Sequence, residues 1–333
     1  MKLFIPLTTQ RTLLPLLSHL RLTHLQTRPL TMSAPATTPA SQDPKEASPA
    51  SASSASKIPK GKTEIKILML HGYTQSGPLF SSKTKALSKL LAKAVSPAPF
   101  NLHPTFLFPT APHRLRPSDI PGYVPPDGVT AEDADEDVSD SWAWFRKDEA
   151  TGAYRGFEEG MHAIATAIAD AGGDVDGVCG FSQGGAVAAL VASALEQHPH
   201  RDPPPSRPSE EETAPAAEAE AEAEADWSWV SALRKANNNK PLRFCVIYSG
   251  FYAPVDSLRW LYDPPIATPT LHFLGSLDTV VEESRSKGLV ERCKDPTVVV
   301  HPGGHYVPVA KDWAMALVGW LRQRYEDPKA ASK

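Results

Sequence analysis

Short runs of apolar residues alternate along the chain with segments in which apolar residues recur every three or four positions. The short runs have the length of buried strands, and the periodic segments have the pattern of helices that cover a sheet. Strands are predicted at 65–70, 104–108, 175–179, 242–248, 270–274 and 297–300, and helices around 87–95, 157–168, 186–195 and 313–321. This alternation predicts an α/β fold, with a mainly parallel sheet and helices on both of its faces.

The ends of the chain and one internal segment lack this pattern. Residues 1–62 are rich in Pro, Ser, Thr and Ala, and we expect a disordered extension there. Residues 198–240 are acidic and low in complexity, and we interpret them as a surface insert within a single domain that spans 63–325. Within the insert, 226–233 contains two tryptophans and is predicted to form a short helix that packs back on the domain or lines its pocket. Residues 326–333 are expected to be a tail.

Composition also bears on location. Residues 1–42 contain no Asp or Glu but four Lys and Arg among Leu, Thr and Ser, a composition typical of a mitochondrial presequence and also of sequence upstream of a true start at Met32. No segment reaches the roughly 18 consecutive apolar residues that a membrane-spanning helix needs. The odd number of cysteines, 3, argues against a disulfide framework and for a reducing compartment. We expect a cytoplasmic protein, with a nuclear fraction also open and mitochondrial targeting by residues 1–31 as the alternative.

Charge and motif content exclude several classes of function. The chain has 34 Lys and Arg against 38 Asp and Glu, a net charge of −4, which offers no basic face for nucleic acid. It contains no glycine-rich nucleotide-binding loop. No His, Cys and acidic residues cluster at metal-ligand spacing, and the acidic run at 132–137 is interpreted as a solvated loop. We therefore expect neither a cofactor nor a metal.

The pentapeptide GFSQG at 180–184 is the strongest chemical signal in the chain. It follows the predicted strand at 175–179 and precedes the alanine- and leucine-rich helix at 186–195. In such a strand–turn–helix, the serine is held at a sharp turn, and the flanking glycines let other backbone pass close by. The helix also directs its free N–H groups and positive dipole end toward the place where an oxyanion would form. Ser182 is therefore the candidate nucleophile.

A serine nucleophile needs a base, and the base needs an acid that orients it. In hydrolases built around this turn, the order along the chain is Ser, then Asp or Glu, then His. Asp278 lies in the loop that leaves the predicted strand at 270–274, and His305 lies in the loop that leaves the strand at 297–300. Both therefore lie at carboxyl ends of parallel strands, the usual place for sites in such sheets. We take Asp278 as the candidate acid and His305 as the candidate base.

Other histidines and aspartates compete for these roles. His272 lies inside a predicted strand and His301 ends one, so both are interpreted as packed or edge residues. Asp256 and Asp263 are alternative acids, but neither directly follows an apolar strand. His71 follows an early strand, and we expect it to pack and form hydrogen bonds beneath the turn that carries the serine.

The exit of the first strand suggests an oxyanion hole. The predicted strand at 65–70 runs directly into His-Gly at 71–72, and such a turn supplies the second oxyanion N–H group in this class of enzyme. The candidate donors are the backbone N–H groups of Tyr73 and of Gln183, the residue after the nucleophile. Ser76 is predicted to cap the next helix.

Together these segments resemble a fungal-type family of serine hydrolases within the α/β-hydrolase superfamily. The similarity extends from about 65 to 321 and is carried by HGY at 71–73, GFSQG at 180–184, SGF at 249–251, HPGGHYVP at 301–308 and the tryptophan-bearing segment at 141–145. The family includes the ovarian-cancer-associated hydrolase and thioesterases that release polyketides in lovastatin-type pathways. The acidic insert and the long N-terminal extension depart from the family pattern.

The resemblance implies an α/β-hydrolase fold and esterase or thioesterase activity on acyl substrates, with Ser182 as nucleophile, Asp278 as acid and His305 as base. The expected partner is a small acyl ester or thioester, and an acyl-carrier partner stays open. The turn GFSQGG is also similar to that of acyl-protein thioesterases and related carboxylesterases, which is the alternative function. A catalytically dead binding protein of the same fold is a further alternative, although all three triad candidates are present. Specificity is expected to come from the segment 113–150 and the aromatic residues Phe251, Tyr252 and Tyr306.

Overall fold

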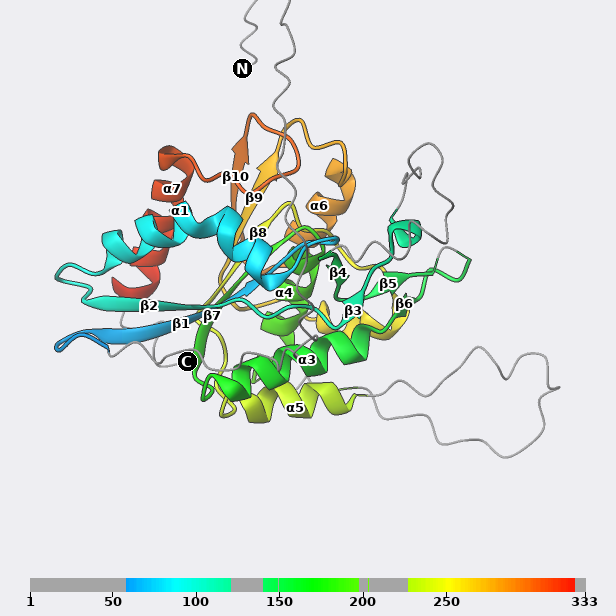
Figure 1. The fold of residues 1–333 in the computed structure, drawn as a ribbon, viewed down its shortest axis with the longest axis horizontal. Coiled ribbons are helices and arrows are strands. Elements are labelled where there is room, and N and C mark those ends of the chain that lie inside the picture. The colour runs from blue at the N-terminus through cyan, green and yellow to red at the C-terminus, as the bar shows by residue number, and fades with distance from the viewer. Residues whose placement is uncertain (1–57, 121–139, 149, 198–202, 204–226, 327–333) are drawn as a thin grey trace, which may run out of the picture. The chain divides into compact units, whose positions relative to one another are not determined.

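Six parallel strands form the central sheet of the computed structural model, which describes residues 58–120, 140–148, 150–197, 203 and 227–326. The strands are β1 (Thr63–Leu70), β2 (Leu102–Leu107), β7 (Val175–Phe181), β8 (Phe244–Tyr248), β9 (Thr270–Gly275) and β10 (Thr297–His301). Their order across the sheet is β10-β9-β8-β7-β1-β2 (Figure 1). The predicted mainly parallel sheet is confirmed, and the strands begin and end within two residues of the predicted limits at most positions.

Alternation along β1 divides the hydrophobic core between the two faces of the sheet. Successive side chains of a strand point to opposite faces. Ile65, Ile67 and Met69 accordingly belong to one buried cluster, whereas Leu68 and Leu70 belong to the other. Both faces are therefore covered, as expected for a parallel sheet.

Helices supply the rest of each cluster. The helices are α1 (Gly77–Val95), α3 (Phe157–Asp170), α4 (Gln183–Ala194), α5 (Ser228–Ala236), α6 (Glu283–Val290) and α7 (Lys311–Glu326). Helices α1 and α7 pack against each other on one face, and α3 packs against α5 on the other (Figure 1). Every residue of α4 is buried, because this helix lies between the sheet and other elements and is made mostly of small and apolar residues.

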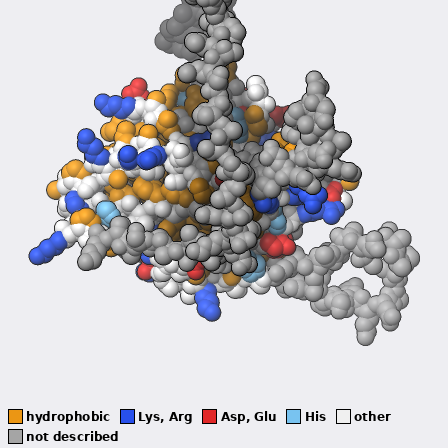
Figure 2. Space-filling model, viewed as in Figure 1, with side chains coloured by type: hydrophobic (Ala, Val, Ile, Leu, Met, Phe, Trp, Pro, Cys, Tyr) orange, Lys and Arg blue, Asp and Glu red, His pale blue; other side chains and the backbone are white. Residues whose placement is uncertain are grey.

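Helix α1 shows how the sequence shapes one covering helix. Ser76 accepts a hydrogen bond from the Leu79 N–H at 3.3 Å, and Pro78 occupies the first turn, where a missing N–H costs nothing. The predicted cap at Ser76 is confirmed. The lysines of α1 lie on its exposed side, and Figure 2 shows Lys and Arg side chains interspersed with hydrophobic ones on this face of the molecule.

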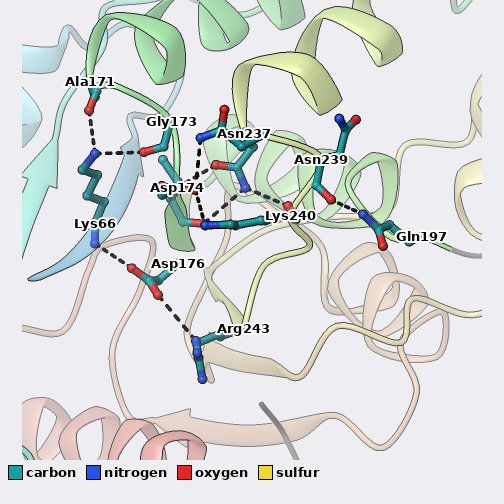
Figure 3. A network of polar contacts seen from close by, with 12 residues as sticks. Lys66, Ala171, Gly173, Asp174, Asp176, Gln197, Asn237, Asn239, Lys240 and Arg243 are labelled. Atoms are coloured by element: carbon teal, nitrogen blue, oxygen red, sulfur yellow. Dashed lines mark hydrogen bonds and ion pairs between the residues drawn. The ribbon is translucent and has the colours of Figure 1, made fainter. Parts of the chain in front are cut away.

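A polar network holds the edge of the sheet where β1 and β7 begin (Figure 3). The Nζ of Lys66 donates to the carbonyl oxygens of Ala171 at 2.6 Å and Gly173 at 2.9 Å, which follow the end of α3. The carboxylate of Asp176 accepts the Lys66 N–H at 3.0 Å and pairs with Arg243, which precedes β8, at 3.5 Å. These contacts set the strand starts relative to α3, and the carboxyl ends of the same strands lie at the opposite edge.

The segment 198–240, predicted to be a surface insert, contains a helix that belongs to the folded domain. Helix α5 lies within 198–240, and its Trp229, Val230 and Leu233 are buried, which confirms the short helix predicted near 226–233. The expectations for the N-terminal extension up to residue 57, for the acidic run at 132–137, for most of the insert and for the tail from 327 fall outside the described residues. None of the described helices is both long and apolar enough to span a membrane.

Candidate active site

Ser182 lies at the turn between β7 and α4 in a strained backbone conformation. Its φ is 54° and its ψ is −117°, values that residues other than glycine rarely adopt. The surrounding structure holds it there, because the Ser182 N–H donates to the Tyr248 carbonyl at 2.9 Å and the Ser182 carbonyl accepts the Gly185 N–H at 2.9 Å. The residue as a whole is 9% exposed, so little of it reaches solvent.

The two glycines around Ser182 are required by close backbone contacts. A Cβ atom on Gly180 would collide with the carbonyl oxygen of Gly184. A Cβ atom on Gly184 would collide with the carbonyl oxygens of Leu70 and His71 at the exit of β1. Only glycine lets these three backbone segments meet, as predicted for this turn.

Three predicted site residues meet in one hydrogen-bonded chain. His305 Nε2 lies 2.8 Å from Ser182 Oγ, and His305 Nδ1 lies 2.8 Å from Asp278 Oδ2. The side chains of His305 and Asp278 are 14% and 7% exposed, so little water reaches the two hydrogen bonds. Asp278 and His305 come from the loops after β9 and β10, which are neighbouring strands.

The carboxylate of Asp278 is held by the backbone of its own loop. Its Oδ1 accepts the N–H groups of Val280 and Val281, each at 3.0 Å, which leaves Oδ2 for His305. Burial acts to raise the pKa of Asp278. The hydrogen bonds from Val281 and His305 outweigh burial and hold the pKa below its ordinary value. Asp278 is therefore an ionised acceptor at neutral pH.

The rival histidines form no hydrogen bond with the candidate serine. His272 lies within β9 and is 1% exposed, and burial lowers its pKa to about 4. His301 ends β10, is 1% exposed and packs against the rings of Tyr306 and Trp313. Burial lowers the pKa of His301 more than the nearby Asp278 charge raises it. Both are packed residues, as their sequence positions indicated.

Neither rival acid is a partner of the His305 imidazole. Asp256 begins the short helix η2 (Asp256–Leu261), is exposed and pairs with Arg259 at 3.7 Å. Asp263 is also exposed, and neither carboxylate is hydrogen-bonded to His305. Among the residues that the structure describes, no group of three His, Cys, Asp or Glu side chains could hold a metal ion.

The two candidate oxyanion donors come from the loops that leave β1 and β7, which are neighbouring strands. The chain passes from β1 outward to β2 and later returns to β7 on the other side of β1, and such a switch point is where open α/β sheets bind ligands. Gly72, after β1, lies close to the side chains of Phe181 and Ser182, so the next residue, Tyr73, adjoins the turn. The Tyr73 N–H has no acceptor among the described residues, and Gln183 begins α4, where N–H groups lack acceptors within the helix.

His71 supports the turn from below. It is fully buried, its Nε2 accepts the Ala111 N–H at 3.0 Å, and its Nδ1 lies 2.8 Å from the Gly72 carbonyl. Burial lowers the pKa of His71 to about 4, against smaller opposing effects of Gly72 and Asp140. His71 is therefore neutral at physiological pH, and it is buried and hydrogen-bonded as predicted, with its carbonyl oxygen against Gly184 of the turn.

The side chain of Gln183 has a role that the sequence did not reveal. Its Oε1 accepts the Trp144 N–H at 2.8 Å, and its Nε2 donates to the Phe145 carbonyl at 2.9 Å. Trp144 in turn donates from its indole to the His71 carbonyl at 2.9 Å. The tryptophan-bearing segment is thus fastened to the residue after the nucleophile. The only sequence signal was the presence of glutamine inside the GFSQG motif.

Comparison with known proteins shows the family of the chain. A family model described as "Serine hydrolase (FSH1)" matches residues 61–317. The protein named family of serine hydrolases 2 from Saccharomyces cerevisiae is 29% identical over 262 residues, 77% of this chain and 97% of that protein. Esterase OVCA2 from Danio rerio is 28% identical over 277 residues, 79% of this chain and 95% of that protein.

Some relatives are about twice as long as the region they share with this chain, and solved structures align more weakly. A dihydrofolate reductase from Schizosaccharomyces pombe is 30% identical over 244 residues, which are 73% of this chain but 44% of the reductase. The crystal structure of acyl-protein thioesterase 2 from Zea mays aligns over 80% of this chain and 96% of that one, with 19% identity and a TM-score of 0.43. Because the family model covers well over half of the sequence, the chain belongs to this serine hydrolase family and has an α/β-hydrolase fold.

Proposed function

We propose that the protein hydrolyses carboxylic esters or thioesters of acyl substrates through a Ser182–His305–Asp278 triad and an acyl-enzyme intermediate. The observation that carries the proposal is a single imidazole, His305, hydrogen-bonded at 2.8 Å both to a serine hydroxyl and to a buried carboxylate. This is the arrangement that activates serine in unrelated hydrolases. The family to which the chain belongs supports the same chemistry.

In the first step, Ser182 Oγ attacks the acyl carbonyl while His305 Nε2 takes the hydroxyl proton. The carboxylate of Asp278 accepts the Nδ1–H of His305, which selects the tautomer with a free Nε2 and stabilises the imidazolium that forms. The tetrahedral intermediate then collapses, and His305 returns the proton to the leaving alcohol or thiol. A water molecule, deprotonated by His305 in the same way, hydrolyses the acyl-enzyme.

The negative charge on the attacked oxygen needs preorganised donors. We assign this role to the backbone N–H groups of Tyr73 and Gln183, with the N-terminal end of α4 adding its dipole. Loss of one such donor typically costs on the order of 3 kcal/mol of transition-state stabilisation. The absence of a described acceptor for the Tyr73 N–H supports this assignment.

Ser182→Ala tests the proposal most directly. We expect it to abolish hydrolysis of 4-nitrophenyl acyl esters and covalent labelling by a fluorophosphonate probe, with an unchanged melting temperature. Ser284→Ala, an exposed serine on α6, is the matched control and should retain both properties. Undiminished labelling of the Ser182→Ala protein would contradict the assignment of the nucleophile. A panel that adds an S-palmitoylated peptide to the esters separates a small-ester hydrolase from an acyl-protein thioesterase.

We further propose a cytoplasmic location, with a nuclear fraction. The proposal is supported by the cysteines, because Cys179, Cys245 and Cys293 are buried and free. Imaging of the full chain with a C-terminal fluorescent tag tests it. A mitochondrial signal that disappears when residues 1–31 are deleted would establish the alternative.

A further inference from the structure

Arg285 of α6 presents an exposed guanidinium that two aromatic side chains hold in position. The guanidinium carbon lies 4.2 Å from the centre of the Phe251 ring. The side chain also lies near the hydroxyl of Tyr154. Burial raises the pKa of that hydroxyl, and the positive charge of Arg285 lowers it less strongly. An arginine stacked on an aromatic face keeps its N–H edge free for a planar anion.

Hydrogen bonds and close packing connect the start of α6 to the turn that carries the nucleophile. The Ser286 Oγ donates to the Gly250 carbonyl at 2.9 Å, and the Arg285 carbonyl accepts the Tyr252 N–H at 3.0 Å. Gly250 in turn packs directly against Gly185, since a Cβ atom built on Gly185 would lie 3.0 Å from the Gly250 Cα. The start of α6 is therefore one layer of residues away from the first turn of α4.

A second, independent set of contacts leads to the same place. Tyr154 stacks on Phe145, with ring centres 4.1 Å apart and an interplanar angle of 11°. The Phe145 carbonyl accepts the hydrogen bond from the side chain of Gln183, which follows the nucleophile. Tyr154 belongs to the short hairpin of β5 (Arg146–Lys147) and β6 (Tyr154–Arg155), which lies on the same side of the sheet as α6 in Figure 1. Both aromatic partners of Arg285 are thus connected to the turn that carries Ser182, Phe251 through the adjacent Gly250 and Tyr154 through Phe145.

Arg285 lacks the ion pair that several other arginines form. Arg146, Arg155, Arg243 and Arg259 each pair with an aspartate. Within the described part of the chain, no carboxylate forms an ion pair with Arg285. Among the described residues, its guanidinium is held by aromatic contacts rather than by a carboxylate, an arrangement suited to a carboxylate that arrives with a ligand.

We propose that Arg285 determines specificity by binding a carboxylate carried by the substrate, so that the preferred esters or thioesters carry a second, anionic end. This inference rests on the proposed function. The carboxylate can belong to the acyl chain, as in a half-ester of a dicarboxylic acid, or to the leaving group. A carboxylate in either position can form the same bidentate hydrogen bonds with the guanidinium. Two pairs of chromogenic esters distinguish the two positions.

The acyl-chain arm compares mono-4-nitrophenyl adipate with 4-nitrophenyl hexanoate, which has the same number of carbons. The leaving-group arm compares 3-carboxy-4-nitrophenyl butyrate with 4-nitrophenyl butyrate. Wild-type protein should prefer the anionic ester in the arm that matches the position of the substrate carboxylate. In that arm, Arg285→Gln should lower the anionic-to-neutral ratio of kcat/KM by about tenfold to hundredfold, mainly through KM. Hydrolysis of the neutral ester should stay within about twofold, and Arg285→Lys should retain part of the preference.

Arg292→Gln is the matched control. Arg292 also stacks on a tyrosine, with its guanidinium carbon 3.5 Å from the centre of the Tyr252 ring, and it donates to the Gly288 carbonyl at 2.7 Å. Its substitution should leave the anionic-to-neutral ratio unchanged. The salt dependence of the wild-type protein is a second readout. Its preference for the anionic ester should weaken between low salt and about 0.5 M NaCl, because salt screens the charge interaction.

An unchanged ratio in Arg285→Gln, or a preference in wild-type protein that salt does not alter, would overturn the inference while leaving the proposed hydrolase function intact. Failure of the wild-type enzyme to hydrolyse any of the four esters would instead contradict the proposed function. In that case, ligand binding, measured as a shift in melting temperature, tests the role of Arg285. Adipate should raise the melting temperature of the Ser182→Ala protein more than hexanoate does, and adding Arg285→Gln should remove that difference. Equal effects of adipate and hexanoate on the Ser182→Ala protein would overturn the inference.

Discussion

The Nε2 atom of His305 lies 2.8 Å from the Oγ atom of Ser182, although 123 positions separate the two residues in the chain. They meet because β7 and β10 run parallel within one sheet, so the loops that leave both strands lie at the same edge. Asp278 leaves β9, the neighbour of β10, and reaches the other nitrogen of the imidazole. The parallel sheet thus converts three distant loops into one hydrogen-bonded chain.

Asp278→Asn should lower kcat by about 10⁴-fold, by analogy with other triads. The amide can still accept the N–H groups of Val280 and Val281, but its NH₂ group facing Nδ1 favours the wrong tautomer of His305. The melting temperature should therefore change little. Steady-state kinetics with an activated ester provide the measurement. Asp256→Asn is the control, and a comparable loss of kcat in that variant would move the acid to η2.

Gly184→Ala should prevent folding or destabilise the protein by several kcal/mol. Its Cβ atom would enter the space of the carbonyl oxygens of Leu70 and His71, and backbone cannot move aside as a flexible side chain can. Gly319→Ala on α7 is the matched control, because its Cβ atom would meet nothing within 4 Å and alanine favours the helix by about 0.5–1 kcal/mol. Urea unfolding should show opposite signs for the two variants. Equal stability of Gly184→Ala and wild type would contradict the packing of the turn described above.

Gln183→Leu should destabilise the protein by on the order of 3 kcal/mol, since it leaves the Trp144 N–H and the Phe145 carbonyl without their partner in a buried site. Activity should fall as well, because the tryptophan-bearing segment is no longer fastened to the turn. Gln197→Leu, at an exposed position, should change stability by less than about 0.5 kcal/mol. Chemical denaturation of the two variants compares these effects, and similar losses in both would rule out a special role for Gln183.

Acid pH should destabilise the protein in part through His272. Burial lowers the pKa of His272 to about 4, whereas the histidine of an unfolded chain has a pKa near 6.5. Between these values the unfolded state binds a proton that the folded state does not, so stability falls by about 1.4 kcal/mol per pH unit as the pH drops from 6.5 toward 4. His71, whose pKa is also lowered to about 4, acts in the same direction.

His272→Leu isolates the contribution of His272. The Nε2 of His272 has no hydrogen-bond partner among the described residues, so leucine leaves no partner of that atom unpaired. The loss in unfolding free energy between pH 7 and pH 5 should be smaller in the variant by about 2 kcal/mol. Denaturation curves at both pH values measure this difference. A pH dependence identical to that of wild type would show that His272 does not titrate in this way.

Several features of the fold and site follow from local sequence. The period of apolar residues distinguishes strands from helices, and the glycines of the GFSQG motif mark a turn that other side chains would block. Helix α6 was not predicted, because its residues are mostly polar and only Ser286 and Leu289 are buried. Its position depends on packing against the loop after β8, which no local pattern reveals.

By itself, the sequence determined the parallel α/β architecture, the strained serine turn and the candidates Ser182, Asp278 and His305, because strand exits in a parallel sheet share one edge. Only the tertiary structure decided which atoms meet. The Gln183 side chain reaches Trp144 and Phe145, 39 and 38 residues away, and Arg285 stacks on Phe251 through contacts that no spacing in the chain specifies. Side-chain direction and cross-segment contact depend on how distant elements pack, and periodicity carries information only about neighbours along the chain.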